Sequence, residues 1–469
     1  MKGWYVPSDP EEQKGESTGW YASFWDFCAA YLEERFGAQW CLSPEQSLFL
    51  HAGNRTVPQQ LLVRAPKGGN KPTRMPHKTS LLDVKLDLTE EKQREQSDKL
   101  RIYTLPASLV FSGPGLFRQN STDARAALAM IQDASDVLAI LLDGGHSRIA
   151  GRLAGAFRNI GRNKIAQDII DTMKSAGYDV RESDPFEESA PFSAGARELS
   201  AYVTRVTLMW HAMREEVMNN FPEAPKKKIN IDAYMKHVEE IYALDAYHSL
   251  SIEGYRVSAE LIERVRAGAW DPDNEEDRKE RNALAARGYH EAFEVVTQNV
   301  KKVLDGENPG EVSDSDHTSW YRELFAPSVN AGIVKAADLA GYRNGPVYIR
   351  KSMHSPPSRE AVRDMMPLLF ELLKEESNPA VRVVLGHFVF VYIHPYVDGN
   401  GRMGRFLMNV MLASGGYPWT IIPVEKRDDY MQSLEAASVD QNIQPFTKFL
   451  ATLVTDIIEG RPGPKIPAS

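Results

Sequence analysis

Residues 381–416 read VRVVLGHFVFVYIHPYVDGNGRMGRFLMNVMLASGG, and this stretch decides how the C-terminal half of the chain folds. Apolar residues dominate both flanks, which predicts two buried helices. The central HPYVDGNG separates them, because Pro395 cannot continue a helix interior and the Gly-Asn-Gly of residues 399–401 tolerates unusual backbone angles. We therefore expect a helix, a turn and a second helix.

The turn and the start of the second helix have the features of an anion-binding site. Backbone N–H groups of the Gly-Asn-Gly turn form a nest, and the next helix adds its free N–H groups and its dipole. Arg402 and Arg405 lie one helical turn apart and can bind phosphate oxygens in bidentate fashion. Asp398 supplies the oxygen ligand that Mg²⁺ needs beside a polyphosphate. His394, with a pKa near neutrality, is suited to removing a hydroxyl proton.

These groups together meet the needs of phosphoryl or nucleotidyl transfer. A DGNG turn alone would favour an ordinary corner between two helices, with solvated arginines. The whole twelve-residue run favours a catalytic site.

The run HPYVDGNGRMGR resembles the Fic (Fido) family pattern HPFxDGNGRxxR, from which it departs only at Tyr396, which keeps an apolar ring. The resemblance implies that His394 is the general base and that Asp398 holds Mg²⁺. The phosphate-binding residues that it implies are Gly399, Asn400, Gly401, Arg402 and Arg405. Tyr430 lies where relatives have a tyrosine lining the nucleotide pocket, but Ser438 stands where many relatives have asparagine. A core or surface role for Tyr430 is the alternative.

The family's usual reaction is attack by a Ser, Thr or Tyr hydroxyl of a target protein on the α-phosphate of ATP, which releases pyrophosphate. The resemblance therefore implies a protein adenylyltransferase that uses ATP and Mg²⁺ and that modifies a target protein and itself. Some members transfer other phosphate-linked groups, and removal of AMP is a further option. The DGNGR pattern favours AMP transfer.

The upstream segment AYHSLSIEGYRVS, residues 246–258, contains Ser249 and Glu253 four residues apart, so both lie on one face of a helix. This matches the family's inhibitory pattern, Ser/Thr-xxx-Glu-Gly/Asn. By resemblance, Glu253 would pair with Arg405 and keep that guanidinium from the γ-phosphate. A surface glutamate near a helix end is the alternative.

A second segment, GPVYIRKSMHSPPSREAV (345–362), predicts a β-hairpin that leads into a helix. It resembles the family's flap, which pairs with the backbone of the target as an added strand. The edge expected to dock the target comprises Val347, Tyr348, Ile349 and Arg350. An ordinary surface hairpin is the alternative.

The N-terminal third has a different character. An aromatic helix-like segment at 20–37 precedes the short apolar runs QQLLVRAP and TSLLDVKLDL, which predict a hairpin in a small α/β unit that could be winged-helix-like. Residues 100–131 loosely resemble abortive-infection-type antitoxin or regulator proteins. Arg148 and Arg152 share a helical face that could contact nucleic-acid phosphates, although a solvated amphipathic helix is favoured. The alternative function is therefore a nucleic-acid-binding regulator, or a toxin–antitoxin-like protein, in which the Fic core is a sensor or transfers another group.

The 469 residues exceed one core and predict several domains. We expect a mainly α protein: an α/β domain at 1–180, an acidic linker at 181–193, a Fic-type helical bundle with a β-hairpin flap at 194–460, and a flexible tail at 461–469. The inhibitory helix would lie near 245–254. Helices are expected at 122–142, 147–157 and 164–176, and a polar loop at 305–318.

The net charge of -9 argues against a surface that binds nucleic acid throughout. Two cysteines, Cys28 and Cys41, are expected to be buried and fit a reducing cytoplasm. The N-terminus lacks the apolar region of a secretory signal, and no apolar run is long enough to cross a membrane. We expect a cytoplasmic protein with no membrane contact. The oligomeric state stays open, including a homo-oligomer.

Overall fold

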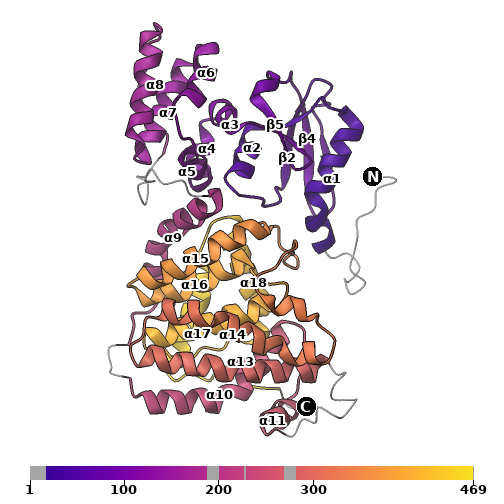
Figure 1. Ribbon diagram of the computed structural model, residues 1–469, viewed down its shortest axis with the longest axis vertical. Coiled ribbons are helices and arrows are strands. Elements are labelled where there is room, and N and C mark those ends of the chain that lie inside the picture. The colour runs from indigo at the N-terminus through magenta and orange to yellow at the C-terminus, as the bar shows by residue number, and fades with distance from the viewer. Residues whose placement is uncertain (1–16, 187–199, 226–228, 269–280, 468–469) are drawn as a thin grey trace. The chain divides into compact units, whose positions relative to one another are not determined.

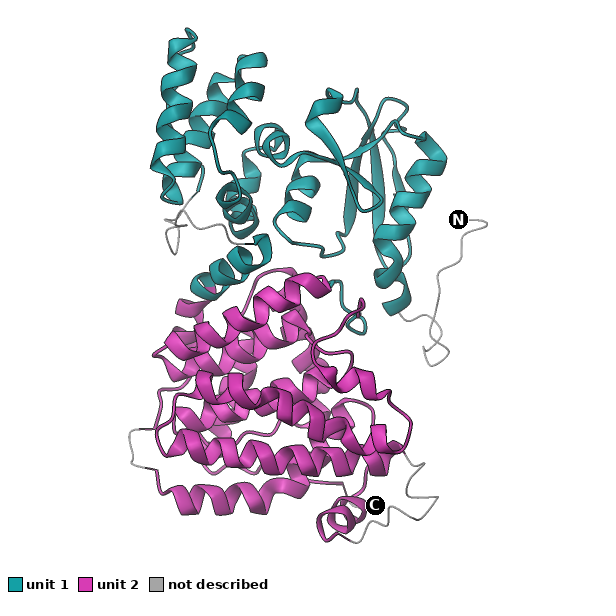
Figure 2. Ribbon diagram, viewed as in Figure 1, with its two compact units in different colours: residues 1–212, 348–357 teal, residues 213–347, 358–469 magenta. Residues whose placement is uncertain are grey.

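The structure, a computed structural model, describes residues 17–186, 200–225, 229–268 and 281–467. These residues fall into two compact units (Figure 2). The N-terminal unit comprises Met1–Ala212 with Tyr348–Pro357, and the C-terminal unit comprises Met213–Val347 with Ser358–Ser469.

The N-terminal unit begins with an α/β half and continues with short helices (Figure 1). The elements of the α/β half are α1 (Thr18–Phe36), β1 (Cys41–Leu42), α2 (Pro44–His51), β2 (Gln60–Ala65), β3 (Pro72–Arg74), β4 (Ser80–Lys85), η1 (Glu91–Gln93), β5 (Arg94–Ser97) and β6 (Leu100–Tyr103). The helices that follow are α3 (Leu105–Phe111), α4 (Gly115–Gln119), α5 (Ser121–Ala129), α6 (Ser135–Asp143), α7 (Ser147–Asn159), α8 (Asn163–Ser175) and α9 (Ala201–Asn220).

The strands form a sheet of order β1-β2-β4-β3 and a separate β5-β6 pair. The two apolar runs expected to pair as a hairpin are instead parallel neighbours, with Gln60 beside Ser80 and Ala65 beside Lys85. The connection between them contains β3, which runs back antiparallel to β4. A connection of this length lets the chain return before β4 begins, so the hairpin is β3–β4.

Alternating side chains of β2 point into a core that the aromatic face of α1 completes. Trp20, Phe24 and Phe27 pack there with Leu61 and Val63. Cys28 and Cys41 are buried free thiols, as expected, and burial raises their pKa values. A second core lies among α3 to α8. The helix expected at 122–142 is in fact two helices, because Asp133 accepts a hydrogen bond from the backbone N of Ser135 and starts α6 anew.

The C-terminal unit is helical (Figure 1). Its elements are α10 (Ile231–Ile252), α11 (Ala259–Arg266), α13 (Arg281–Leu304), α14 (Pro309–Asn330), η2 (Ala336–Ala340), α15 (Arg359–Glu375), α16 (Pro379–Ile393), α17 (Asn400–Ser414), η3 (Val424–Lys426), α18 (Arg427–Val439) and α19 (Gln444–Ile458). Residues 461–467 follow without regular secondary structure.

The expected helix–turn–helix is confirmed by α16 and α17, which pack against each other and are buried on nearly every side. Between α13 and α15, α14 runs through the unit, so the loop expected at 305–318 is wrong for most of its length. Pro309 occupies the first turn of α14, and Asn308 caps it by accepting hydrogen bonds from Gly310 N and Glu311 N. The polar composition of this segment favoured a loop, so the capping signal of Asn308 and Pro309 was overlooked.

The division between the units falls within α9. In the N-terminal unit Arg205 pairs with the buried Asp123, and in the C-terminal unit Arg214 forms a two-pronged ion pair with Glu376 at 2.8 and 2.9 Å. Part of the linker expected at 181–193 lies outside the described residues, and the domain bounds stay a prediction. None of the described helices combines the length and apolarity needed to cross a membrane.

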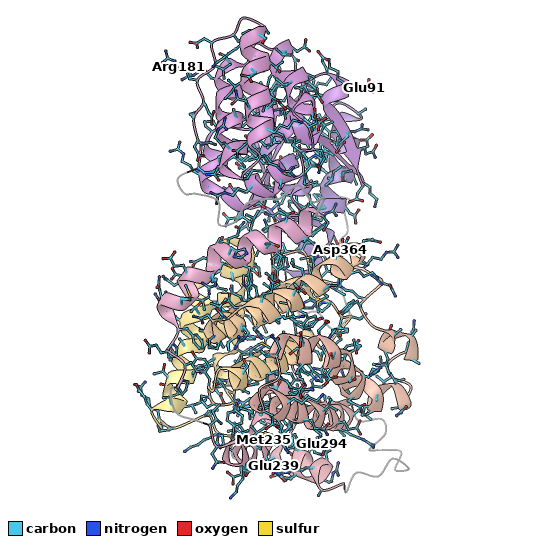
Figure 3. All side chains as sticks on the ribbon, turned by 60° about the vertical axis from the view of Figure 1, so that its left-hand side comes forward. Glu91, Arg181, Met235, Glu239, Glu294 and Asp364 are labelled. Carbon is cyan, nitrogen blue, oxygen red and sulfur yellow. The ribbon has the colours of Figure 1, made fainter. Side chains whose placement is uncertain are left out.

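Charged side chains occupy the outer faces of the C-terminal helices. Figure 3 marks Glu239 on α10 and Glu294 on α13, both of which are exposed.

Candidate active site

The turn between α16 and α17 has a fixed backbone. α16 ends at His394, which adopts the left-handed conformation (φ 52°, ψ 60°) that costs a non-glycine residue about 1–2 kcal/mol. Gly399 is also left-handed (φ 80°) and precedes the first residue of α17. Asn400, the first residue of α17, closes the turn: its Oδ1 accepts from Tyr396 N and its Nδ2 donates to Tyr396 O, both at 2.9 Å.

The side chain of Asn400 is engaged within the turn, and phosphate binding by this residue stays a prediction. Both ends of its amide are engaged by Tyr396, and the residue is buried. Asn400 therefore shapes the turn, and the groups turned toward an anion are the backbone N–H donors at the start of α17, which have no intrahelical partner.

Beneath the turn, the ring of Tyr396 is fully buried and stacks on Tyr321 of α14, with ring centroids 3.9 Å apart. The aromatic position of the motif is thus a support for the turn, and tyrosine serves there. Phe325 lies one helical turn further along α14. A Cβ on Gly399 would come within 2.7 Å of the Phe325 ring, so this position requires glycine for space as well as for its φ angle.

The imidazole of His394 is held neutral. Burial, the first cause, and the nearby Arg343 guanidinium lower the pKa of His394 from 6.5 to about 4. Nδ1 lies 3.3 Å from Val391 O. A carbonyl oxygen can only accept, so we assign the proton to Nδ1, which leaves the Nε2 lone pair to accept a proton. The expected pKa near neutrality is corrected downward, and the imidazole is unprotonated at pH 7.

Two buried arginines follow on α17. Arg402 is 1% exposed, and its guanidinium lies over the rings of Tyr255, at 5.2 Å, and Phe325, at 5.0 Å. Its Nε and Nη2 make no hydrogen bond with any described residue, and the same holds for Nη1 of Arg405. Buried guanidinium N–H groups are costly to leave without acceptors. These donors therefore suit an anion such as a phosphate.

The remaining donors of Arg405 bind the end of α10. Its Nε donates to Ser249 Oγ at 2.9 Å, and its Nη2 donates to Ser249 O at 3.0 Å and to Glu253 Oε1 at 2.7 Å. A Cβ at Gly401 would overlap with the same Glu253 oxygen. The structure thus brings Ser249 and Glu253 to the first turn of α17, and the carboxylate lies on the backbone where an anion would bind.

Asp398 lies on the open side of the turn, and its side chain is 60% exposed. Its Oδ1 accepts from Gly399 N at 2.6 Å, and its Oδ2 lies 3.5 Å from Arg402 Nη2. An accessible carboxylate beside buried phosphate-type donors fits Mg²⁺, which binds through one or two carboxylates plus the phosphates of a substrate.

Tyr430 is buried, which agrees with the core role that the sequence leaves open for it. It is 1% exposed, and its hydroxyl lies 2.7 Å from His387 Nε2. His387 Nδ1 lies 2.8 Å from Gly404 O, so Nδ1 donates there and Nε2 accepts from Tyr430. The tyrosine thus anchors α18 to the α16–α17 pair beside Arg405. Contact with a nucleotide stays a prediction for this residue.

The expected β-hairpin flap is not formed: residues 345–358 make turns and extended backbone without a strand. Pro346, Pro356 and Pro357 remove three N–H donors that a strand ladder would use. Tyr348–Pro357 belongs to the N-terminal unit, where Lys351 N donates to Thr18 Oγ1 and Val57 N donates to Met353 O. Within that unit Tyr348 and Ile349 line a small depression with Tyr21. Target docking by Val347–Arg350 stays a prediction.

The arginines of α7 are largely engaged within the N-terminal unit. Arg152 donates to Ser112 O at 2.9 Å and lies over the Phe117 ring. Arg158 pairs with Glu182. These contacts agree with the packed helix that the sequence favours over a nucleic-acid face, and binding of nucleic acid stays untested.

Arg343 contributes to the site although the sequence gives no sign of it. It is 2% exposed, and its guanidinium donates to the carbonyls that surround His394. Asp245 was also missed. It is a buried carboxylate one turn before Ser249, it accepts from Tyr289 Oη at 2.6 Å and from Trp419 Nε1 at 3.1 Å, and burial raises its pKa.

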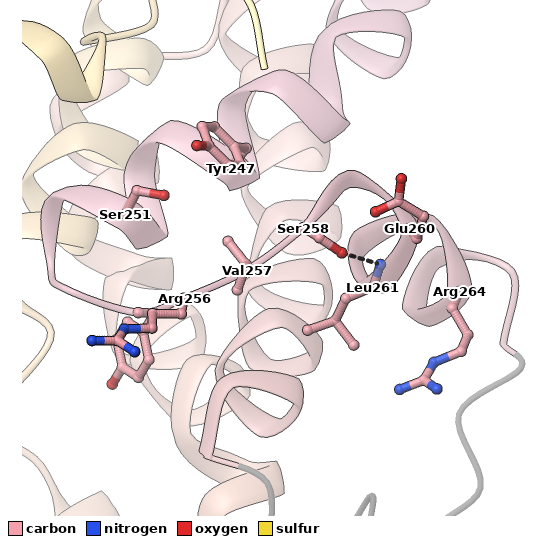
Figure 4. A pocket seen from close by; sticks show the side chains of 9 residues that line it. Tyr247, Ser251, Arg256, Val257, Ser258, Glu260, Leu261 and Arg264 are labelled. Carbon is pink, nitrogen blue, oxygen red and sulfur yellow. Dashed lines mark hydrogen bonds between the residues drawn. The ribbon is translucent and has the colours of Figure 1, made fainter. Parts of the chain in front are cut away.

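An open pocket of about 700 Å³ adjoins the Glu253 turn (Figure 4). It lies between the end of α10 and α11, whose first turn is capped by Ser258 Oγ accepting from Leu261 N. Its lining comprises Tyr247, Ser251, Tyr255, Arg256, Val257, Ser258, Glu260, Leu261 and Arg264.

Part of this chain is similar to known proteins of the Fic/DOC family. The Fic/DOC family model matches residues 313–412. Protein adenylyltransferase fic-1 of Caenorhabditis elegans is 26% identical over 223 residues, which are 47% of this chain and 41% of that protein. Protein adenylyltransferase Fic of Drosophila virilis is 28% identical over 224 residues, with the same coverage.

The chain therefore spans about two fifths of the length of these curated relatives. A solved fragment of Fic-1 from C. elegans aligns with a TM-score of 0.40 and 18% identity, covering 73% of this chain and 95% of that one. The family match runs from within α14 through the catalytic turn to α17. Residues 313–412, which contain the motif HPYVDGNGRMGR, thus match the Fic/DOC family.

Proposed function

We propose that this chain is a protein adenylyltransferase that transfers AMP from ATP to a Ser, Thr or Tyr hydroxyl and is inhibited by its own Glu253. The observation that carries the proposal is the position of Glu253: its carboxylate binds Arg405 and covers Gly401 at the first turn of α17. A carboxylate held on a buried arginine at a helix N-terminus takes the place that a phosphate would have. The printed names of the two relatives support the same activity.

Each residue of the turn has its own role in the proposed reaction. Nε2 of His394 removes the proton of the attacking hydroxyl, and a neutral imidazole is the form able to do so. The hydroxyl oxygen then forms a bond to the α-phosphorus while the bond from that phosphorus to the bridging oxygen breaks. Pyrophosphate leaves and the target keeps AMP. Arg402, Arg405 and the first N–H groups of α17 stabilise the charge on the phosphate oxygens.

Asp398 would hold Mg²⁺, which neutralises part of the polyphosphate charge when it is bound. Asp398 Oδ2 lies 3.5 Å from Arg402 Nη2, and the exposed carboxylate is at the opening of the turn.

Inhibition follows from competition for one guanidinium. While Glu253 occupies Arg405 Nη2, a γ-phosphate cannot use that donor, and the two negative charges repel each other. ATP would then bind in a pose unsuited to in-line attack. Self-modification is expected to rise together with target modification when Glu253 is removed.

The test is label transfer by the Glu253→Gly variant of the full chain in cell lysate. Parallel reactions receive ATP labelled at the α-phosphate, ATP labelled at the γ-phosphate, UTP or CDP-choline. AMP transfer predicts protein label from α-labelled ATP alone. Label from the γ-phosphate would indicate a kinase, and label from UTP or CDP-choline alone would replace AMP with another group. A Glu253→Gly variant no more active than the parent would end the inhibition proposal.

A further inference from the structure

One arginine outside the motif, Arg343, binds three successive carbonyls at the catalytic turn and a fourth carbonyl at Gly345. The Arg343 guanidinium donates from Nε to His394 O at 2.8 Å, from Nη2 to Ile393 O at 3.5 Å, and from Nη1 to Gly345 O at 3.1 Å. Its backbone N donates to Pro395 O at 2.9 Å. Three successive carbonyls of the turn, 51 residues away along the chain, therefore accept from a single residue.

The carbonyls lie where α16 ends, and such carbonyls have no intrahelical donor. A buried cation satisfies them and also complements the negative end of the helix dipole. Burial lowers the pKa of Arg343 to about 10, so it stays charged at pH 7.

We propose that Arg343 is a positioning residue for the general base, in that its guanidinium fixes the peptide groups on both sides of His394 and so sets the direction of the imidazole. The proposal rests on the proposed function. His394 has a left-handed backbone, an unfavourable state that persists only where its surroundings hold it. Rotation of the peptide groups at 393–395 would turn the imidazole away from its present direction, in which Nδ1 faces Val391 O.

The contact with Gly345 connects the same guanidinium to a second segment of the chain. Gly345 lies two residues before Val347, where the segment expected to dock the target begins. Arg343 therefore holds the start of that segment and the base in a fixed relation within the C-terminal unit.

A purely structural role would be an ordinary cap on α16, and Arg382 provides the matched control. It lies near the other end of the same helix, where its Nη1 donates to Glu376 O at 2.6 Å and its Nη2 to Ser414 Oγ at 3.1 Å. Burial lowers its pKa as it does that of Arg343. Replacing either arginine with glutamine removes a guanidinium that binds a carbonyl, but only Arg343 touches the turn.

The experiment compares Arg343→Gln, Arg343→Lys and Arg382→Gln, each in full-length Glu253→Gly protein, by kcat and KM for ATP and by melting temperature. Because displacement of a catalytic group by about 1 Å can cost about 100-fold in rate, Arg343→Gln should lower kcat by that order while KM changes less than about twofold. Arg343→Lys should recover part of kcat, since an ammonium can donate to one of the carbonyls. Arg382→Gln should lower the melting temperature and leave kcat unchanged.

Equal kcat values for Arg343→Gln and Arg382→Gln would overturn the proposal, as would a kcat that only follows the melting temperature. A second measurement does not depend on activity: the ring ¹⁵N signals of labelled histidines. Arg343→Gln should change the His394 signals and leave those of the buried His387 in place. Unchanged His394 signals would overturn the positioning role even if the parent transferred no AMP, and an inactive Glu253→Gly parent would overturn the proposed function alone.

Discussion

Glu253 Oε1 lies 2.7 Å from Arg405 Nη2, although 152 residues separate the two in the chain. The same arginine binds Ser249 through both the hydroxyl and the carbonyl, so the last turn of α10 is fixed to the first turns of α17 at three points. Of these, only the contact of Glu253 places a negative charge on the anion-binding backbone. Replacing Glu253 should therefore leave the anion-binding backbone and Arg405 free to bind phosphate. Replacing Ser249 should only weaken the attachment of α10 to Arg405.

Ser249→Ala is expected to raise basal AMP transfer, but less than Glu253→Gly does. It removes the Oγ acceptor of Arg405 Nε and leaves the backbone carbonyl in place. A charge-assisted hydrogen bond contributes about 1.5–3 kcal/mol, and about 1.4 kcal/mol is a factor of ten, so a rise of about tenfold to a hundredfold is expected in the initial rate of label transfer. Ser251→Ala on the same helix, in the pocket lining, is the control. If the two variants had the same rate, Ser249 would have no part in inhibition.

His394→Ala, made in the Glu253→Gly background, should lose transfer and keep ATP binding. The buried donors for the phosphates belong to α17 and do not involve the imidazole. Loss of a general base typically costs about 10²–10⁴ in rate. Calorimetric titration with ATP and single-turnover label transfer measure the two properties separately. Full transfer by this variant would remove His394 from the mechanism.

Gly399→Ala should both destabilise the protein and abolish transfer. The position needs a positive φ, and a Cβ would meet the ring of Phe325 at 2.7 Å. Gly332, with φ 74° and open space around its Cβ, provides the control for backbone strain alone. Strain of this kind costs about 1–3 kcal/mol, which Gly332→Ala should show in its free energy of unfolding without loss of activity. Equal stability losses for both variants would contradict the packing account.

His387 makes the stability of the fold sensitive to acid. Burial lowers its pKa from 6.5 to about 4, so the unfolded chain binds a proton between these values that the folded chain does not. The contribution of His387 to the free energy of unfolding is fully present above pH 6.5. It is lost as the pH falls toward 4, by up to about 3 kcal/mol. The difference in unfolding free energy between the parent and His387→Gln should shrink over this range. If the difference in unfolding free energy between the two proteins stayed constant between pH 7 and pH 5, His387 would not be the source of the acid sensitivity.

The sequence was most informative where local rules and burial agree. α16 and α17 are apolar on nearly all sides, and Pro395 with Gly399 fixes where they separate, so their order follows from residues close in the chain. Glu253 was found because residues 249–254 resemble the family's short inhibitory pattern, in which the serine and the glutamate share one helical face. Neither inference needed long-range information.

Features that depend on distant pairing were not predictable in this way. The parallel pairing of β2 with β4 depends on where β3 turns back, which the apolar pattern does not encode. Arg343 looks like any surface arginine beside an Asn-Gly turn, because its partners are carbonyls 51 residues further on. The start of α14 was misread for a different reason, since Asn-Pro is a local capping signal that its polar surroundings concealed.

The most direct test of the central claim is the intact mass of purified full-length protein after incubation with ATP and Mg²⁺. Four forms are compared: the parent, Glu253→Gly, Glu253→Gly with His394→Ala, and the exposed control Glu239→Gln. The account predicts that Glu253→Gly gains the mass of AMP, that the double variant gains nothing, and that Glu239→Gln behaves as the parent. AMP addition equal in the parent and in Glu253→Gly, or undiminished in the double variant, would contradict it.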